Sequence, residues 1–186
     1  MKNKKLLLGI AWAWLICLSA NAEVKLPAFF SDGMVMQQQT RANLWGTATP
    51  NAPVKITTSW DKQTYKTTAD AKGAWKLALS TPSAGGPYTI TFDDGKLTEI
   101  RDILMGELWL CSGQSNMEMP MKGFKNQPVE NSNTDVMNSR NPQLRLFTVK
   151  RASSFTPKTD VVGTWQEAVP ATVRESVSYT HLRAHE

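Results

Sequence analysis

The sequence predicts a β-sandwich domain followed by the beginning of an α/β domain, which is left incomplete. Two observations predict this order. As far as Arg101, short segments alternate apolar and polar residues and are separated by turn-forming residues, which is typical of strands with one buried face. After Arg101, apolar residues become nearly continuous, as in the strands of a parallel sheet that is covered on both faces.

Residues 1–22 are expected to be a secretory signal peptide. Lys2, Lys4 and Lys5 form a basic start, residues 6–18 are apolar, and residues 20–22 read Ala-Asn-Ala, a small-x-small cleavage site. The apolar run is shorter than the ~20 residues that span a bilayer, which argues against a membrane anchor. We therefore expect an exported protein, periplasmic or extracellular, that has no membrane association once the signal is removed.

Charge and cysteine content exclude several classes of function. Three lysines of the formal net charge of +5 belong to the leader, and no run of Lys or Arg indicates a nucleic-acid partner. Cys111 is the only thiol after the leader, so no internal disulfide is expected and no cysteine pair could hold zinc. No glycine-rich phosphate loop follows a strand, so we expect neither a metal nor any other cofactor.

Residues 23–101 are expected to form the β-sandwich, as a supporting domain. "VKITTSW" (residues 54–60) and "AWKLAL" (residues 74–79) each alternate apolar and polar side chains. "YTITF" and "KLTEI" flank an Asp-Gly pair, which predicts a β-hairpin. Turn-forming residues separate the predicted strands at Asp32-Gly33, Pro50-Asn51, Lys72-Gly73, Gly85-Gly86-Pro87 and Asp94-Gly95.

The aromatic residues of this domain allow an alternative function. They could line a sugar-binding face, which would make the chain a carbohydrate-binding module without catalysis. The alternation of apolar and polar residues already places them on the buried face of the strands, so we expect core residues instead. The residues concerned are Trp45, Trp60, Trp75, Tyr88 and Phe92.

Residues 102–175 are expected to begin the α/β domain. "DILMGELWLCSG" (residues 102–113) and "PQLRLFTV" (residues 142–149) are predicted as two buried strands. The long polar segment between them is predicted to contain a short helix around residues 133–139. Two buried strands joined by a long crossover are typical of the opening of an α/β layer.

"CSGQSNMEMP" (residues 111–120) holds the candidate catalytic residue, Ser115. It would follow the carboxyl end of a strand, the edge where ligands bind in open α/β sheets. Gly113 permits a sharp turn there, and Gln114 and Asn116 could add or orient donors for an oxyanion. Ser115 could equally be an ordinary turn residue, and Met117 departs from the G-x-S-x-G pattern.

Two other nucleophile or acid–base assignments are weighed against Ser115. Glu107 and Glu118 flank the motif and could form the carboxylate pair of a glycosidase, but each is expected to be a salt-bridged or solvated residue. Cys111 could be a nucleophile, but its place in an apolar strand favours an inert buried thiol.

"GELWLCSGQSNMEMPM" (residues 106–121) resembles the first conserved block of the sialate O-acetylesterases, which belong to the SGNH/GDSL hydrolase superfamily. Residues 26–38 and 44–56 resemble the N-terminal β domain of that family, and residues 163–173 resemble the segment before its next helix. The resemblance implies that residues 102–175 are the N-terminal part of an SGNH, flavodoxin-like, hydrolase domain.

The resemblance also implies a serine esterase that removes O-acetyl groups from sialic acid or related acetylated sugars. Ser115 would be the nucleophile, and its base would be a histidine with an aspartate three residues before it. His181 and His185 follow Ser178 and Leu182 at that spacing, so neither fits. Residues 176–186 depart from the family pattern and look non-native. We therefore expect a truncated fragment that is itself inactive.

Overall fold

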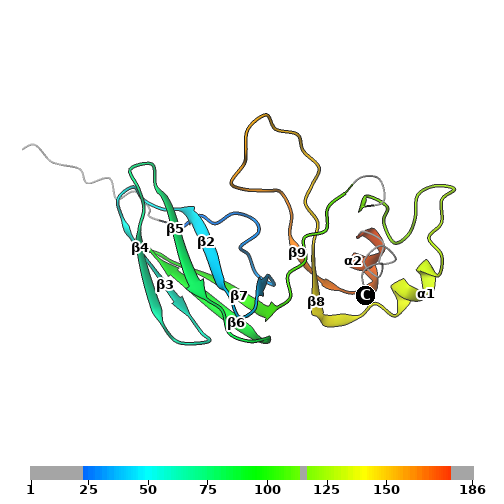
Figure 1. Ribbon diagram of the computed structural model, residues 1–186, viewed down its shortest axis with the longest axis horizontal. Coiled ribbons are helices and arrows are strands. Elements are labelled where there is room, and N and C mark those ends of the chain that lie inside the picture. The colour runs from blue at the N-terminus through cyan, green and yellow to red at the C-terminus, as the bar shows by residue number, and fades with distance from the viewer. Residues whose placement is uncertain (1–22, 114–116, 177–186) are drawn as a thin grey trace, which may run out of the picture.

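The computed structural model describes residues 23–113 and 117–176 of the chain. In these residues, strands β1 to β7 (residues 35–106) occupy one end of the molecule, and β8, β9 and the two short helices α1 and α2 (residues 132–175) occupy the other (Figure 1). The predicted leader lies outside the described residues, and so does nearly all of the tail predicted as non-native.

The first seven strands form a mixed sheet and a separate strand pair. The larger sheet has five strands in the order β1-β7-β6-β3-β4, with β1 and β7 parallel and the other neighbours antiparallel. The remaining two, β2 and β5, pair antiparallel. The bounds are β1 Val35–Gln37, β2 Arg41–Thr47, β3 Pro53–Thr58, β4 Thr64–Thr68, β5 Ala74–Ser80, β6 Gly85–Asp93 and β7 Leu97–Gly106.

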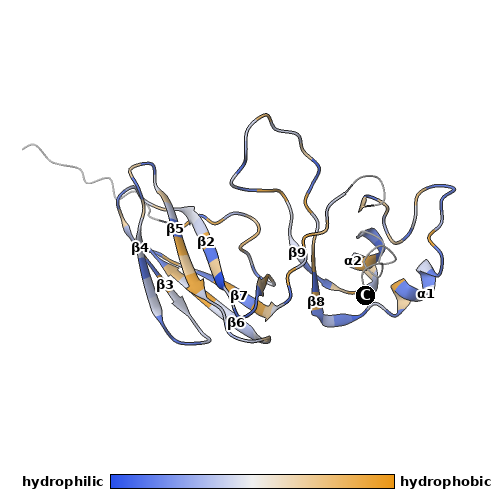
Figure 2. Cartoon of the chain, viewed as in Figure 1, coloured by the Kyte–Doolittle hydropathy of each residue, from blue (hydrophilic) through white to orange (hydrophobic). Residues whose placement is uncertain are grey.

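Alternation along these strands places one face in a common core, as predicted. In β3, Val54, Ile56 and Thr58 are buried while the residues between them are exposed. In β5, Trp75 and Leu79 are buried, and apolar residues run along this strand in Figure 2. Residues from both sheets belong to one hydrophobic cluster, so their burial stabilises the two sheets together.

The aromatic residues of this part are core residues, as the strand alternation predicted. Trp75 and Phe92 are buried, and Trp45, Trp60 and Tyr88 are half-buried against the same cluster. The Trp60 and Tyr88 rings meet edge to face with centroids 5.8 Å apart. These contacts are those of core packing, as the strand alternation predicts.

One predicted hairpin is confirmed and one predicted turn is wrong. The β6–β7 pairing closes at Asp93 and Leu97 around Gly95, whose φ of 117° suits glycine. Gly85-Gly86-Pro87, predicted as a turn, instead lies in β6 beside a register shift. A Cβ on Gly86 would lie 2.7 Å from the carbonyl oxygen of Ile103, so glycine is needed there for close strand approach.

The buried strand predicted for residues 102–113 is wrong in its second half. Ile103 and Met105 are buried, but in β7, as part of the all-β core. Residues 107–113 are not a strand, and Leu108, Trp109 and Leu110 are 39%, 80% and 93% exposed. The apolar run is continuous in sequence, yet the ladder of β7 with β1 ends at Gly106, so residues 108–110 have no strand partner among the described residues.

The second half contains the predicted helix and a strand pair of unexpected kind. α1, Ser132–Met137, lies where the short helix was predicted. β8, Asn141–Phe147, confirms a strand, but it is exposed or half-buried and pairs antiparallel with β9, Trp165–Ala168. The prediction of two buried strands in a parallel layer is therefore wrong for the described residues. α2, Pro170–Glu175, follows β9.

Aromatic contacts and ion pairs join β8 and β9 to the all-β part. The Trp165 ring lies against Phe29 and Phe147, and its Nε1 donates to the Phe29 carbonyl at 2.8 Å. Arg145, whose side chain is only 9% exposed, pairs with Asp102 at 2.9 Å. These contacts hold the end of β7 close to β8, and so fix where the chain after β7 begins.

Candidate functional site

The three residues predicted to form the catalytic motif, Gln114, Ser115 and Asn116, lie outside the described residues. The geometry of the candidate site is therefore that of its two flanks, residues 106–113 and 117–121. Both flanks are held to defined partners, which places the beginning and the end of the motif segment.

The upstream flank begins with a glutamate held by two glutamines. Glu107 accepts from Gln37 Nε2 at 3.0 Å and from Gln38 Nε2 at 2.7 Å. The Leu108 backbone N–H donates to Gln37 Oε1 at 2.9 Å. Hydrogen bonds from Gln38 and then Gln37 favour the ionised carboxylate and lower the pKa of Glu107 below its ordinary value of 4.5.

Gly113 and Met117, the described residues on either side of the motif, lie close together. A Cβ built on Gly113 would lie 2.6 Å from Cγ of Met117, so these two residues approach within van der Waals distance. A side chain at position 113 would collide with Met117. The turn predicted to lead to Ser115 lies outside the described residues.

The downstream flank is tied to α2. Met121 is buried with Ala168 and Val173. Its backbone N–H donates to the Ser176 carbonyl at 2.9 Å, and the Lys122 N–H donates to the Arg174 carbonyl at 3.2 Å. The chain after Ser115 is thus held by both a small apolar cluster and backbone hydrogen bonds.

The two glutamates around the motif do not behave as a glycosidase pair. Glu118 forms an ion pair with Arg151 at 3.0 Å, as expected for a salt-bridged residue. Glu107 is exposed, as expected for a solvated residue, and its lowered pKa is opposite to what a general acid needs.

Cys111 is exposed, so the expectation of a buried thiol is wrong. Cys111 is exposed for the same reason as residues 108–110, because the strand that was predicted to bury it ends at Gly106. Gln37 and Gln38 were missed because they lie about 70 residues from Glu107 in the sequence. Only the parallel register of β1 and β7 brings them together.

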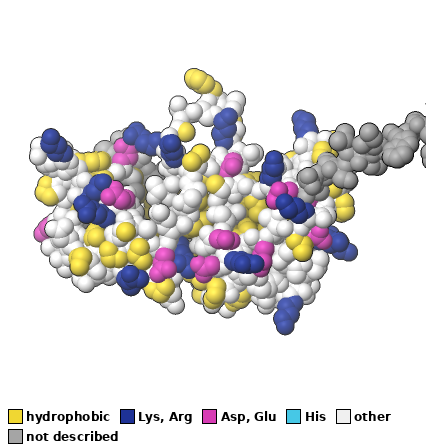
Figure 3. Space-filling view, turned by 180° about the vertical axis from the view of Figure 1, so that it is seen from behind, with side chains coloured by type: hydrophobic (Ala, Val, Ile, Leu, Met, Phe, Trp, Pro, Cys, Tyr) yellow, Lys and Arg dark blue, Asp and Glu magenta, His cyan; other side chains and the backbone are white. Residues whose placement is uncertain are grey.

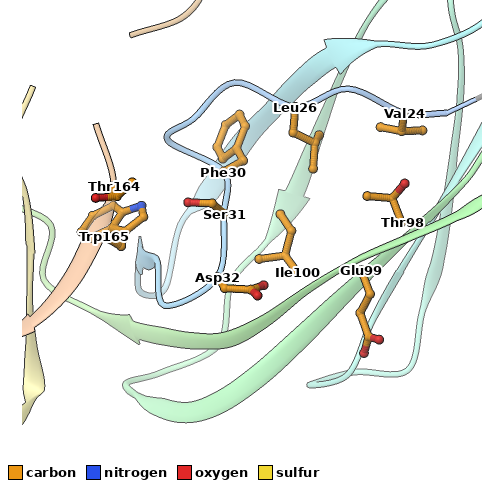
Figure 4. A pocket seen from close by; sticks show the side chains of 10 residues that line it. All are labelled: Val24, Leu26, Phe30, Ser31, Asp32, Thr98, Glu99, Ile100, Thr164 and Trp165. Carbon is orange, nitrogen blue, oxygen red and sulfur yellow. The ribbon is translucent and has the colours of Figure 1, made fainter. Parts of the chain in front are cut away.

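A shallow hollow of about 450 Å³ lies elsewhere, between the N-terminal segment, β7 and β9 (Figure 4). Its two carboxylates are engaged by one arginine: Asp32 accepts from the Arg101 backbone N–H at 2.7 Å, and Glu99 pairs with the guanidinium at 2.8 Å. Among the described residues, none between Gly106 and Met121 lines it. The lining residues are Val24, Leu26, Phe30, Ser31, Asp32, Thr98, Glu99, Ile100, Thr164 and Trp165.

The described residues show no arrangement for a metal ion, since no three His, Cys, Asp or Glu side chains gather among them. Within the same residues, no helix is both long and apolar enough to cross a membrane. Basic and acidic side chains are interspersed over the face shown in Figure 3.

The chain is similar to known esterases over most of its length, although no family model matches it. The sialate O-acetylesterase of Mus musculus is 31% identical over 146 residues, which cover 73% of this chain and 26% of that protein. The human protein of the same name is 32% identical over 126 residues, covering 62% and 24%. The chain thus spans about a quarter of the length of the curated relatives that it matches.

The structure is similar to a crystal structure of a carbohydrate acetylesterase from Xanthomonas citri. The TM-score is 0.77 and the identity is 32%, with 86% of this chain and 36% of that chain covered.

Proposed function

This chain is homologous to the sialate O-acetylesterases over most of its length, and from that premise we propose that it is part of a serine esterase. The reaction would remove O-acetyl groups from sialic acid or related acetylated carbohydrates. The observation that carries this proposal is the agreement of two comparisons. The relatives matched by sequence are named sialate O-acetylesterases, and the neighbour matched by structure is named a carbohydrate acetylesterase.

Residues 23–101 would be the supporting β-sandwich of this esterase, and residues 102–175 the N-terminal part of its SGNH hydrolase domain. One core shared by the two sheets supports the first assignment. The continuation of β7 to Gly106 supports a rigid connection between the two, because the motif segment departs directly from a strand of the supporting domain.

Ser115 would attack the acetyl carbonyl carbon while a histidine takes the hydroxyl proton. The Ser115 backbone N–H would stabilise the oxyanion, with Gln114 and Asn116 adding or orienting further donors. Collapse of this intermediate would transfer the proton to the departing sugar oxygen and leave an acetyl group on Ser115. Water, activated by the same histidine, would then release acetate.

The base of this mechanism has no candidate in the sequence. The 186 residues contain two histidines, and neither has an aspartate three residues before it. We propose that a longer polypeptide of the same gene supplies the Asp-x-x-His pair, and that this chain alone is inactive. A serine hydroxyl without a base is a weak nucleophile, so the expected loss is at least about 10³-fold.

Hydrolysis of p-nitrophenyl acetate tests both statements. The present chain should show no turnover that depends on Ser115. The longer polypeptide should hydrolyse the ester, lose activity in Ser115→Ala and keep it in Ser112→Ala, a matched change in the same segment. Turnover by the present chain that Ser115→Ala abolishes would contradict its inactivity. Equal activity of both variants in the longer polypeptide would contradict the nucleophile.

A further inference from the structure

We propose that Gln37, Gln38 and Glu107 form a clamp that positions the segment leading to Ser115. The proposal rests on the proposed function, since it concerns how the nucleophile of that esterase is placed. Glu107 lies directly after β7 and precedes Ser115 by eight positions in the sequence. The role assigned to the three residues is positioning, which acts through the residues between Glu107 and Ser115.

Each polar group of the clamp is matched to a partner. The two carboxylate oxygens of Glu107 each accept from one glutamine amide, at 3.0 Å from Gln37 and 2.7 Å from Gln38. The oxygen of each glutamine then accepts from a backbone N–H, of Leu108 at 2.9 Å and of Ala84 at 2.8 Å. The clamp therefore joins the end of β1, the residue before β6 and the first residues after β7.

The clamp begins where the strand ladder ends. The parallel pairing of β1 with β7 finishes at Gln37 and Gly106, and the Gln38 N–H donates to the Gly106 carbonyl at 2.9 Å. Residues 108–110 are exposed and have no strand partner among the described residues. The glutamine side chains thus replace the missing ladder and fix the direction in which the chain leaves the sheet.

Placement of a nucleophile is sensitive to such a contact. An error of about 1 Å at a reacting group can cost about 10²-fold in rate. By contrast, hydrogen bonds between exposed groups contribute little to global stability. A clamp of exposed amides and a carboxylate should therefore affect the position of residues 107–113 much more than it affects the unfolding of the all-β part.

The change Glu107→Gln is the most direct test. It keeps the size of the side chain but replaces one acceptor oxygen by a donor, which must face one of the two glutamine amides. Either Gln37 or Gln38 then loses this bond or turns and releases its backbone partner. The reciprocal change, Glu107→Gln with Gln38→Glu, restores a donor opposite an acceptor and keeps an acceptor for the Ala84 N–H.

Hydrogen exchange of the Leu108 and Ala84 amides in the full chain is the first measurement, since they are the backbone partners of Gln37 and Gln38. We expect about tenfold faster exchange of at least one of these amides in Glu107→Gln, recovery to within about threefold in the reciprocal double variant, and no change in Glu99→Gln, an exposed glutamate of β7. The thermal midpoint should stay within about 2 °C of the unsubstituted chain in all three. Unchanged exchange in Glu107→Gln, or no recovery in the double variant, would overturn the clamp.

Steady-state kinetics of the longer polypeptide are the second measurement. Positioning predicts that Glu107→Gln lowers kcat about 10- to 100-fold with KM within about twofold, and that the double variant restores kcat. An exchange effect without any kcat effect would show a merely structural contact and overturn positioning. If the longer polypeptide has no esterase activity at all, the proposed function fails while the exchange result still decides whether the clamp exists.

Discussion

Gly113 lies close to Met117, the first described residue after the motif. Its missing side chain lets Met117 approach, since a Cβ would lie 2.6 Å from Met117 Cγ. Gly106 stands in the same segment, yet a Cβ there would meet nothing within 4 Å. The two glycines therefore form a matched pair in which only one has a steric reason to be glycine.

Gly113→Ala should displace Met117 and loosen the downstream flank. Overpacking of this kind costs about 1 kcal/mol or more, which corresponds to roughly fivefold faster local opening. Hydrogen exchange of peptides covering residues 117–122 should show that increase in Gly113→Ala and none in Gly106→Ala. Equal behaviour of the two variants would mean that the approach of Met117 to Gly113 does not stabilise the downstream flank.

The pKa of Glu107 predicts how the contact with Leu108 responds to acid. Hydrogen bonds to the carboxylate lower the folded-state pKa, so this stabilisation is complete above the ordinary value of 4.5 and is lost as the pH falls through the lower folded value. The Leu108 amide resonance should titrate with a midpoint below 4.5, and this titration should vanish in Glu107→Gln. A midpoint at or above 4.5 would contradict the hydrogen bonds seen here.

Among the elements, β3 could be predicted from sequence and the segment after β7 could not. Apolar and polar side chains alternate along β3, which predicts the face that packs on the core, and Val54 and Ile56 are buried on that face. The apolar run through residues 103–110 predicts only that these side chains would be more stable with packing neighbours. Which neighbours supply that cover depends on distant strands, and the β1–β7 ladder ends halfway along the run.

In the candidate site too, some features could be predicted from sequence and others could not. The local sequence was sufficient to predict that Glu118 is salt-bridged or solvated, and it pairs with Arg151. It could not identify Gln37 and Gln38, because their proximity to Glu107 results from a parallel pairing of strands far apart in sequence.

Ile56 in β3 provides a test of the core at the level of an element. It is fully buried, so Ile56→Ala should lower the free energy of unfolding by about 2–5 kcal/mol through lost burial and a cavity. Lys66→Ala, in the exposed positions of the neighbouring β4, should change it by no more than about 0.5 kcal/mol. Urea unfolding measures both, and similar values for the two variants would contradict the assigned core.

At the scale of the whole molecule, the contacts between the all-β part and the β8–β9 pair hold the two flanks of the motif in place relative to each other. Trp165 contributes a ring packed against Phe29 and Phe147 and one hydrogen bond at 2.8 Å. Arg145 adds ion pairs to Asp102 and Glu167. The contact of Trp165 with Phe29 joins segments that are more than a hundred residues apart in sequence.

Trp165→Ala should release this junction. We expect a loss of about 2–4 kcal/mol in unfolding free energy and faster proteolysis between β8 and β9, because a half-buried tryptophan loses its packing and its hydrogen bond. Trp109→Ala is the matched control, since Trp109 is 80% exposed and should leave both unchanged. Equal losses from the two tryptophans would contradict the junction described here.

Covalent trapping of the nucleophile tests the central claim most directly. The longer polypeptide would be treated with a fluorophosphonate, which reacts with activated serines, and its modified peptide identified by mass spectrometry. The account predicts one adduct, on Ser115, that is absent in Ser115→Ala and present in Ser112→Ala. An active esterase that carries the adduct on another residue, or that loses no activity in Ser115→Ala, would contradict it.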